Sequence, residues 1–101
     1  MIDEPRKALF HLGPIVATPG AIEDLERNGM TGLELLKRHV TGDWGDLCEE
    51  DKKANEAALI TGARIFSSYT LHDCKLWVIT DAEVDDQHHR YCTTLLRPQD
   101  Y

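Results

Sequence analysis

Positive charge and long apolar runs are both scarce in this sequence. It has 18 Asp and Glu residues against 11 Lys and Arg residues, which gives a formal net charge of −7 over 101 residues. A sequence-independent grip on DNA or RNA needs many Lys and Arg side chains to replace phosphate counterions. A membrane-spanning helix needs about 20 consecutive apolar residues, and no stretch of the sequence approaches that length. The sequence therefore disfavours direct nucleic-acid binding and a membrane-embedded protein.

Cysteine is also sparse. The three cysteines, Cys48, Cys74 and Cys92, would leave one thiol over in any disulfide scheme. Three free thiols in a reducing compartment are the simpler account. Residues 1–5 contain two acids and a proline instead of the basic start and apolar run of a secretory signal. We therefore expect a cytoplasmic protein without disulfides.

Glycine-rich phosphate loops, internal repeats and low-complexity tracts are missing as well. The seven glycines stand singly along the chain, so nucleotide binding has no support from a phosphate-loop motif. A length of 101 residues allows one hydrophobic core. With 42% hydrophobic and 29% charged residues, the composition is that of a globular protein. We expect a single domain over residues 1–101.

The first two thirds of the sequence predict helices. A threonine N-cap followed by proline predicts a helix over 19–28. Thr31 and Glu34 form a capping box, which predicts a second helix over 32–41. Three acids followed by several alanines predict a third helix over 49–60, because acids interact favourably with a helix N-terminus and alanine is the strongest helix former.

The last third of the sequence predicts strands. The runs 64–71, 75–80 and 91–96 are rich in β-branched and aromatic residues and are separated by turn residues. They predict an antiparallel meander, with the Ile15-Val16 segment as a candidate fourth strand. About three short helices packed on a three- to four-stranded antiparallel sheet give a two-layer α+β domain. Three short helices can cover only one face of the sheet. The other face is therefore either solvated or used by a partner.

The densest cluster of unusual residues lies between the second and third predicted helices. There, Asp43 and Asp46 flank Trp44 and Gly45, and Gly42 directly precedes Asp43. Two carboxylates beside a ring could form a sugar-binding or hydrolytic cleft, but such a pair also caps helix ends and turns corners. In the structural interpretation, the Trp44 side chain packs between the helices and the sheet, and Gly42 and Gly45 adopt positive φ. The candidate binding residues are Asp43, Trp44, Asp46, Glu50, Asp51 and Asn55.

Zinc ligands are present without the spacing of a zinc site. His72, Cys74, His88, His89 and Cys92 carry suitable atoms, but the paired short spacing of such sites is missing. The expected strand 75–80 places Cys74 at one end and the His88-His89 turn at the other. At about 3.3 Å per residue, these ends lie roughly 15 to 20 Å apart. We expect no metal ion and no cofactor.

Catalytic arrangements receive little support. The neighbours His72, Asp73 and Cys74 include the residue types of a nucleophilic triad, but successive side chains on a strand point to opposite faces, and a tight turn exposes its groups. Asp73-x-Lys75 is similar to the acid-x-lysine element of metal-dependent nucleases, yet so short a pattern is frequent by chance. We therefore assign no catalytic residue, and an enzyme is the less favoured interpretation.

Five segments along nearly the whole chain carry a resemblance. They are L-G-P-I-V-A-T-P-G-A at 12–21, R-H-V-x-G-D-W-G-D-L at 38–47, E-D-K-x-A-N at 50–55, L-W-x-I-T at 76–80 and the ending L-L…Y at 95–101. Together they resemble a family of small proteins carried on bacterial plasmids and integrated elements, some of them labelled as restriction-modification subunits. The resemblance implies a mobile-element setting and supplies no catalytic residues. Cys48 stands where that family usually has an acid, and 84–90 looks like an enlarged turn.

The acidic charge suits attraction to a basic protein surface, including that of a DNA-binding protein, although a solvated acidic surface that aids solubility is the commoner explanation. We expect a non-enzymatic interaction protein that binds a protein partner through 43–51 or through the open sheet face. One version is anti-restriction or anti-defence activity by mimicry of DNA. The alternative is a small-molecule binder or enzyme with a site around Asp43, Trp44 and Asp46. A homo-oligomer formed through the open sheet face is a third interpretation.

Overall fold

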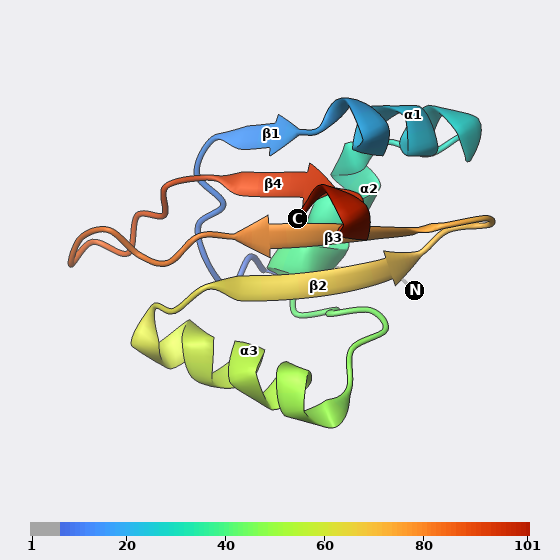
Figure 1. Ribbon diagram of the computed structural model, residues 1–101. Coiled ribbons are helices and arrows are strands. Elements are labelled where there is room, and N and C mark those ends of the chain that lie inside the picture. The colour runs from blue at the N-terminus through green and yellow to red at the C-terminus, as the bar shows by residue number, and fades with distance from the viewer. Residues whose placement is uncertain (1–6) are drawn as a thin grey trace, which may run out of the picture.

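The computed structural model of the protein describes residues 7–101 (Figure 1). Within this range the chain forms three α-helices, four strands and a short 3₁₀ helix. Their order is β1 (Ile15–Ala17), α1 (Pro19–Arg27), α2 (Gly32–Val40), α3 (Glu49–Thr61), β2 (Ile65–Thr70), β3 (Lys75–Thr80), β4 (Thr93–Leu96) and η1 (Pro98–Asp100). The predicted α+β class is confirmed.

The four strands form one mixed sheet in the order β1-β4-β3-β2. The meander β2-β3-β4 is antiparallel, as predicted. β1 pairs with β4 in parallel, with Val16 opposite Thr94, so the prediction of a purely antiparallel sheet was wrong for this strand. The three helices and two strands between β1 and β4 provide the long connection that a parallel pair requires.

The helix boundaries follow local capping chemistry. The Thr18 hydroxyl accepts a hydrogen bond from the Ala21 amide at 3.1 Å at the start of α1. At the start of α2, the Glu34 carboxylate accepts a hydrogen bond from the Thr31 amide at 3.4 Å. α3 ends at Gly62, which has a φ of 80°. Such left-handed C-caps favour glycine.

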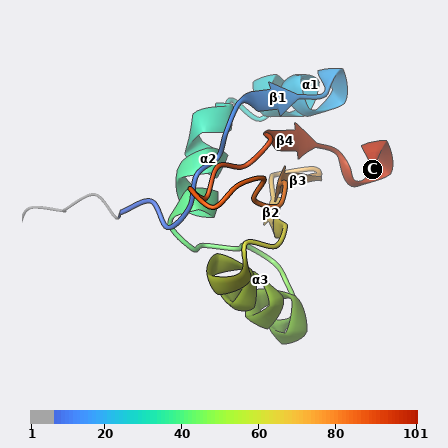
Figure 2. The ribbon, with the colours of Figure 1, turned by 90° about the vertical axis from the view of Figure 1, so that its left-hand side faces the viewer.

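The helices occupy two different positions around the sheet. α1 and α2 cover one face, and the main core lies between them and the sheet. α3 instead runs along the outer edge of β2, and η1 lies on the face opposite α2 (Figure 2). The main core consists of Ala21, Leu25, Leu35, Leu36, Tyr69, Leu71, Leu76, Val78 and Leu95. The face opposite α1 and α2 therefore carries only η1 among the described helices.

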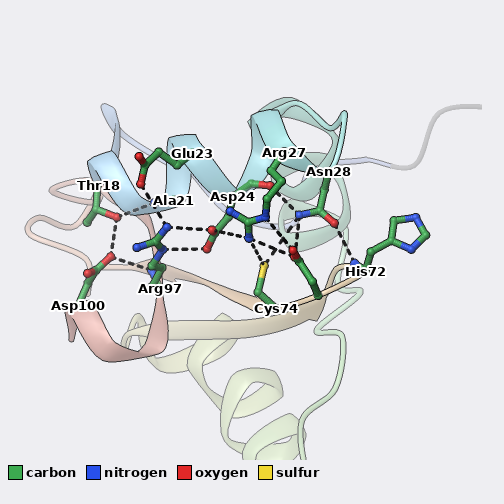
Figure 3. A network of polar contacts seen from close by, with 11 residues as sticks. Thr18, Ala21, Glu23, Asp24, Arg27, Asn28, His72, Cys74, Arg97 and Asp100 are labelled. Atoms are coloured by element: carbon green, nitrogen blue, oxygen red, sulfur yellow. Dashed lines mark hydrogen bonds and ion pairs between the residues drawn. The ribbon is translucent and has the colours of Figure 1, made fainter.

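A network of ion pairs fastens α1 to the rest of the molecule (Figure 3). Its centre is the buried Asp24, whose carboxylate accepts hydrogen bonds from Arg97 Nε and Nη2, both at 2.9 Å. Arg27 Nη2 donates to the same carboxylate at 2.8 Å, and Arg27 Nε donates to Asp73 at 2.7 Å. The network thus joins α1 to the β2–β3 turn and to the segment after β4.

Candidate protein-binding face

The 43–46 loop pairs with the outer edge of β2. The Asp46 amide donates to the Ser68 carbonyl oxygen at 2.7 Å, and the Ser68 amide donates to the Trp44 carbonyl oxygen at 3.1 Å. Gly45 lies between them with a φ of 74°, and a Cβ at this position would overlap the Ser68 carbonyl group. Only glycine combines this backbone conformation with this close approach. The loop therefore acts as a short extra strand.

Asn55 on α3 closes the next part of the same edge. Its Nδ2 donates to the Phe66 carbonyl oxygen at 2.6 Å, and its Oδ1 accepts from the Phe66 amide at 3.1 Å. The buried side-chain amide thus replaces a neighbouring strand. An edge strand left open is a template for unwanted pairing, and here loop and helix together seal it.

Trp44 lies at the centre of this seal. Its side chain is 5% exposed and packs with Ala58 and Ile65 in a second core cluster. Its indole N–H donates to Glu56 on α3 at 3.1 Å. The contacts of Trp44 and Asn55 are therefore structural, and a binding role for either residue stays a prediction.

The two loop aspartates are engaged in different directions. The Asp43 carboxylate accepts from Arg38 Nε on α2 at 2.7 Å. The Asp46 carboxylate accepts from the Thr70 hydroxyl, and the side chain of Thr70 lies on the sheet face opposite α2 because its strand neighbour Tyr69 belongs to the main core. The Asp43 carboxylate also accepts from the Gly45 amide at 3.2 Å, so each of the two carboxylates has polar contacts of its own.

The sheet face opposite α1 and α2 carries a cluster of aromatic side chains. The Trp77 ring lies edge-on to Phe66, with ring centroids 5.0 Å apart, and edge-on to Tyr101, with centroids 5.8 Å apart. With Ile79 they line a hollow of about 270 Å³. We call Phe66, Trp77, Ile79 and Tyr101 the aromatic face. In Figure 1, η1 lies in front of the sheet, and Tyr101, which directly follows η1, places its ring against Trp77.

The acidic start of α3 borders the aromatic face. Asp51 lines the same hollow as the aromatic residues, and so does Arg64, which donates a hydrogen bond to the Tyr101 hydroxyl. Asp46 and Glu50 are exposed close to Asp51 in the chain. The two surfaces considered in the sequence, the acidic segment and the open sheet face, therefore meet at Asp51.

A buried chain of polar side chains lies beneath α2, and it was not predicted from the sequence. His39 is fully buried, with Nδ1 2.6 Å from Ser67 Oγ and Nε2 2.8 Å from Thr80 Oγ1. Thr80 Oγ1 lies 2.8 Å from Thr93 Oγ1, which donates to the Leu12 carbonyl oxygen. Burial lowers the pKa of His39 to about 3, so the ring is neutral. Its position three residues after Leu36 on the inward stripe of α2 was the available signal.

The other candidate ligands are dispersed. In Figure 3, Cys74 and the β2–β3 turn face Arg27 and Asn28, while His88 and His89 contact Glu83 and Asp85 within their own loop. All three cysteines are free thiols. Residues 7–101 hold no group of three or more His, Cys, Asp or Glu side chains placed to bind a metal ion.

Similarity to known proteins adds nothing to this geometry. No family model, no curated protein and no solved structure matches the chain. No helix in the described range is long and apolar enough to cross a membrane. The candidate site consequently depends on two observations, namely an aromatic cluster on a sheet face that no α-helix of residues 7–101 covers and an acidic helix start at its border.

Proposed function

We propose that this protein is a non-enzymatic interaction module that binds a basic partner protein through the aromatic face and the acidic start of α3. The observation that carries the proposal is the hollow lined by Phe66, Trp77, Tyr101 and Asp51. The net charge of −7 favours a partner of opposite charge.

The composition of this surface matches that of protein interfaces. Tyr and Trp are enriched among the residues that dominate binding energy, and such residues lie at the centre of the contact. Charged residues at the rim contribute more to the rate of association and to partner choice than to affinity. Trp77 and Tyr101 would supply the centre, and Asp46, Glu50 and Asp51 the rim.

The resemblance to mobile-element proteins supports a partner from the bacterial host or from the element itself. In the anti-restriction version the partner is a DNA-binding defence protein. A DNA mimic needs aligned, unpaired carboxylates, whereas Asp24 and Asp73 are paired with arginines in the α1 network and Asp43 is paired with Arg38. These pairs support an adaptor that uses one local surface over a mimic of the whole DNA backbone.

The test is capture of partners from a bacterial lysate on the immobilised protein, with identification by mass spectrometry. Tyr101→Ala removes an aromatic side chain that is 71% exposed, and Tyr91→Ala is the matched control because Tyr91 is 72% exposed outside the aromatic face. We expect Tyr101→Ala to weaken capture at least about tenfold, because residues of this type commonly contribute more than 1.4 kcal/mol. Tyr91→Ala should leave capture unchanged.

The charge component has its own variant pair. Asp51→Asn and Asp86→Asn each remove one exposed carboxylate, the first at the aromatic face and the second in the loop before β4. Asp51→Asn should reduce capture and its dependence on salt, while Asp86→Asn should change neither. Equal capture by Tyr101→Ala, Asp51→Asn and the wild type would refute the proposed surface.

A further inference from the structure

The two edges of the sheet are treated in opposite ways. The β2 edge is sealed by 43–46 and Asn55. Within the described range 7–101, β1 forms the other edge and pairs only with β4. In this parallel pair the N–H and C=O groups of Val16 point toward β4, so those of Ile15 and Ala17 point outward. None of these four outward groups has a hydrogen-bond partner within residues 7–101.

The side chains beside this open edge are apolar and accessible. Ile15, Val16, Ile22 and Leu33 are each close to half exposed or more. A groove of about 400 Å³ runs between β1, α1 and α2, and ten residues from these elements and their surroundings line it, of which Glu26 is the only charged one. Exposed apolar surface of this kind marks contact sites in soluble proteins.

The absence of charge along this edge indicates what covers it. Residues 8–22 contain no Asp, Glu, Lys or Arg, and no other stretch of the sequence is uncharged for so long. A basic partner finds almost no opposite charge here. Two copies that each carry a net charge of −7 repel one another over most of their surfaces, and they approach with least repulsion through this uncharged segment.

We propose that β1 pairs antiparallel with β1 of a second copy across a two-fold axis at Val16. In this register Ile15 lies opposite the partner's Ala17, and the outward groups of both residues form hydrogen bonds. Val16 then faces its counterpart at a non-hydrogen-bonded position, where Cα atoms are about 4.5 Å apart. The two four-stranded sheets become one continuous sheet, and the exposed Ile15, Ile22 and Leu33 lie next to the contact.

Sedimentation equilibrium over a range of protein concentrations tests this pairing. We expect concentration-dependent dimerisation that strengthens as NaCl rises, because salt screens the repulsion between like-charged copies. Val16→Lys places two like charges opposite each other and should give a monomer. Val84→Lys is the matched control, because Val84 is 62% exposed and Val16 48% exposed, and it should leave the dimer intact. Circular dichroism verifies that both variants fold.

Disulfide trapping tests the register. In a Cys48→Ser background, which removes the exposed thiol, Val16→Cys should form a linked dimer under mild oxidation, because the expected Cα separation lies within the disulfide range. Mass spectrometry should find the bond between the two substituted positions. Val84→Cys should not be trapped.

Three results would overturn the proposal. One is a monomer at all protein and salt concentrations, and another is a dimer that Val16→Lys does not disrupt. The third is loss of captured partner protein, instead of loss of self-association, in Val16→Lys, which would assign the edge to a partner's strand. The proposed function is tested independently of the dimer. Its variants change Tyr101 and Asp51 instead of Val16, and partner binding should weaken with salt, whereas dimerisation should strengthen.

Discussion

Gly45 marks the closest approach between two segments of the backbone. Its φ of 74° is shared in kind by Gly29, whose φ is 63°. The two differ in surroundings, because a Cβ at Gly45 would overlap the Ser68 carbonyl group and a Cβ at Gly29 would meet nothing within 4 Å. Comparing alanine substitutions at Gly45 and Gly29 therefore separates the energetic cost of a left-handed residue from the cost of losing the contact between the loop and β2.

Gly45→Ala should lower the free energy of unfolding by about 3 kcal/mol or more, because backbone strain is added to the loss of the pairing with β2. Gly29→Ala should lower it by about 1 to 2 kcal/mol, the ordinary cost of a left-handed residue. Urea denaturation of the two variants and the wild type measures both values. Equal effects would show that the close approach at Gly45 adds nothing.

His39 links stability to pH. Burial, reinforced by the charge of Arg90, lowers the pKa of His39 in the folded protein to about 3, against an ordinary value of 6.5. Because the unfolded chain takes up the proton first, the contribution of neutral His39 is fully present above pH 6.5. It is lost as the pH falls from 6.5 toward 3, at up to about 1.4 kcal/mol per pH unit.

Urea denaturation between pH 7 and 4.5 tests this dependence, since the carboxylates titrate mainly below that window. His39→Gln should reduce the slope of the unfolding free energy against pH by the contribution of close to one proton, about 1.4 kcal/mol per pH unit. His72→Gln is the control, because His72 is exposed on the β2–β3 turn, and it should keep the slope of the wild type. An unchanged slope in His39→Gln would contradict the assignment.

At the scale of elements, local chemistry predicted most boundaries. Helix ends are set by contacts within a few residues, at the N-caps Thr18 and Thr31 and at Gly62, the C-cap of α3. The structure confirms all three helices. The parallel pairing of β1 with β4 was not predictable in this way, because it joins segments almost 80 residues apart. Register between distant segments depends on the assembled core.

The candidate site shows the same division. The sequence predicted an important connection at 43–55 and an open sheet face, but not that Asp51 lies at their border. It also offered two interpretations of Trp44, and the contacts with Glu56 and Ile65 fit the structural one. Asn55 was a candidate binding residue, and its side-chain amide pairs with the backbone of Phe66, so its binding role stays a prediction.

α1 depends on its ion-pair network. Asp24→Asn keeps the shape of the side chain but removes the charge that faces Arg27 and Arg97. Since breaking a buried ion pair is strongly destabilising, we expect a loss of about 3 kcal/mol in urea denaturation. Glu26→Gln removes a charge from the exposed surface of the same helix and should change stability by less than about 0.5 kcal/mol. Similar effects of both variants would refute the anchoring role.

At the scale of the whole molecule, the two proposed contacts are opposite in character and involve different parts of one sheet. The aromatic face is bordered by acids and suits a basic partner, so its binding should weaken as salt rises. The β1 edge is uncharged, so pairing of copies there should strengthen under the same change. Measuring both in one NaCl series separates the two surfaces without any substitution, and parallel trends would show that one surface serves both contacts.

The sealed β2 edge also decides how far assembly extends. A sheet with two open edges can add copies indefinitely, as fibres do. Here the loop at Gly45 and the side chain of Asn55 block one edge, and in the proposed dimer a second copy occupies the other. The two remaining outer edges of such a dimer are both sealed β2 edges. Growth by edge pairing therefore stops at two chains.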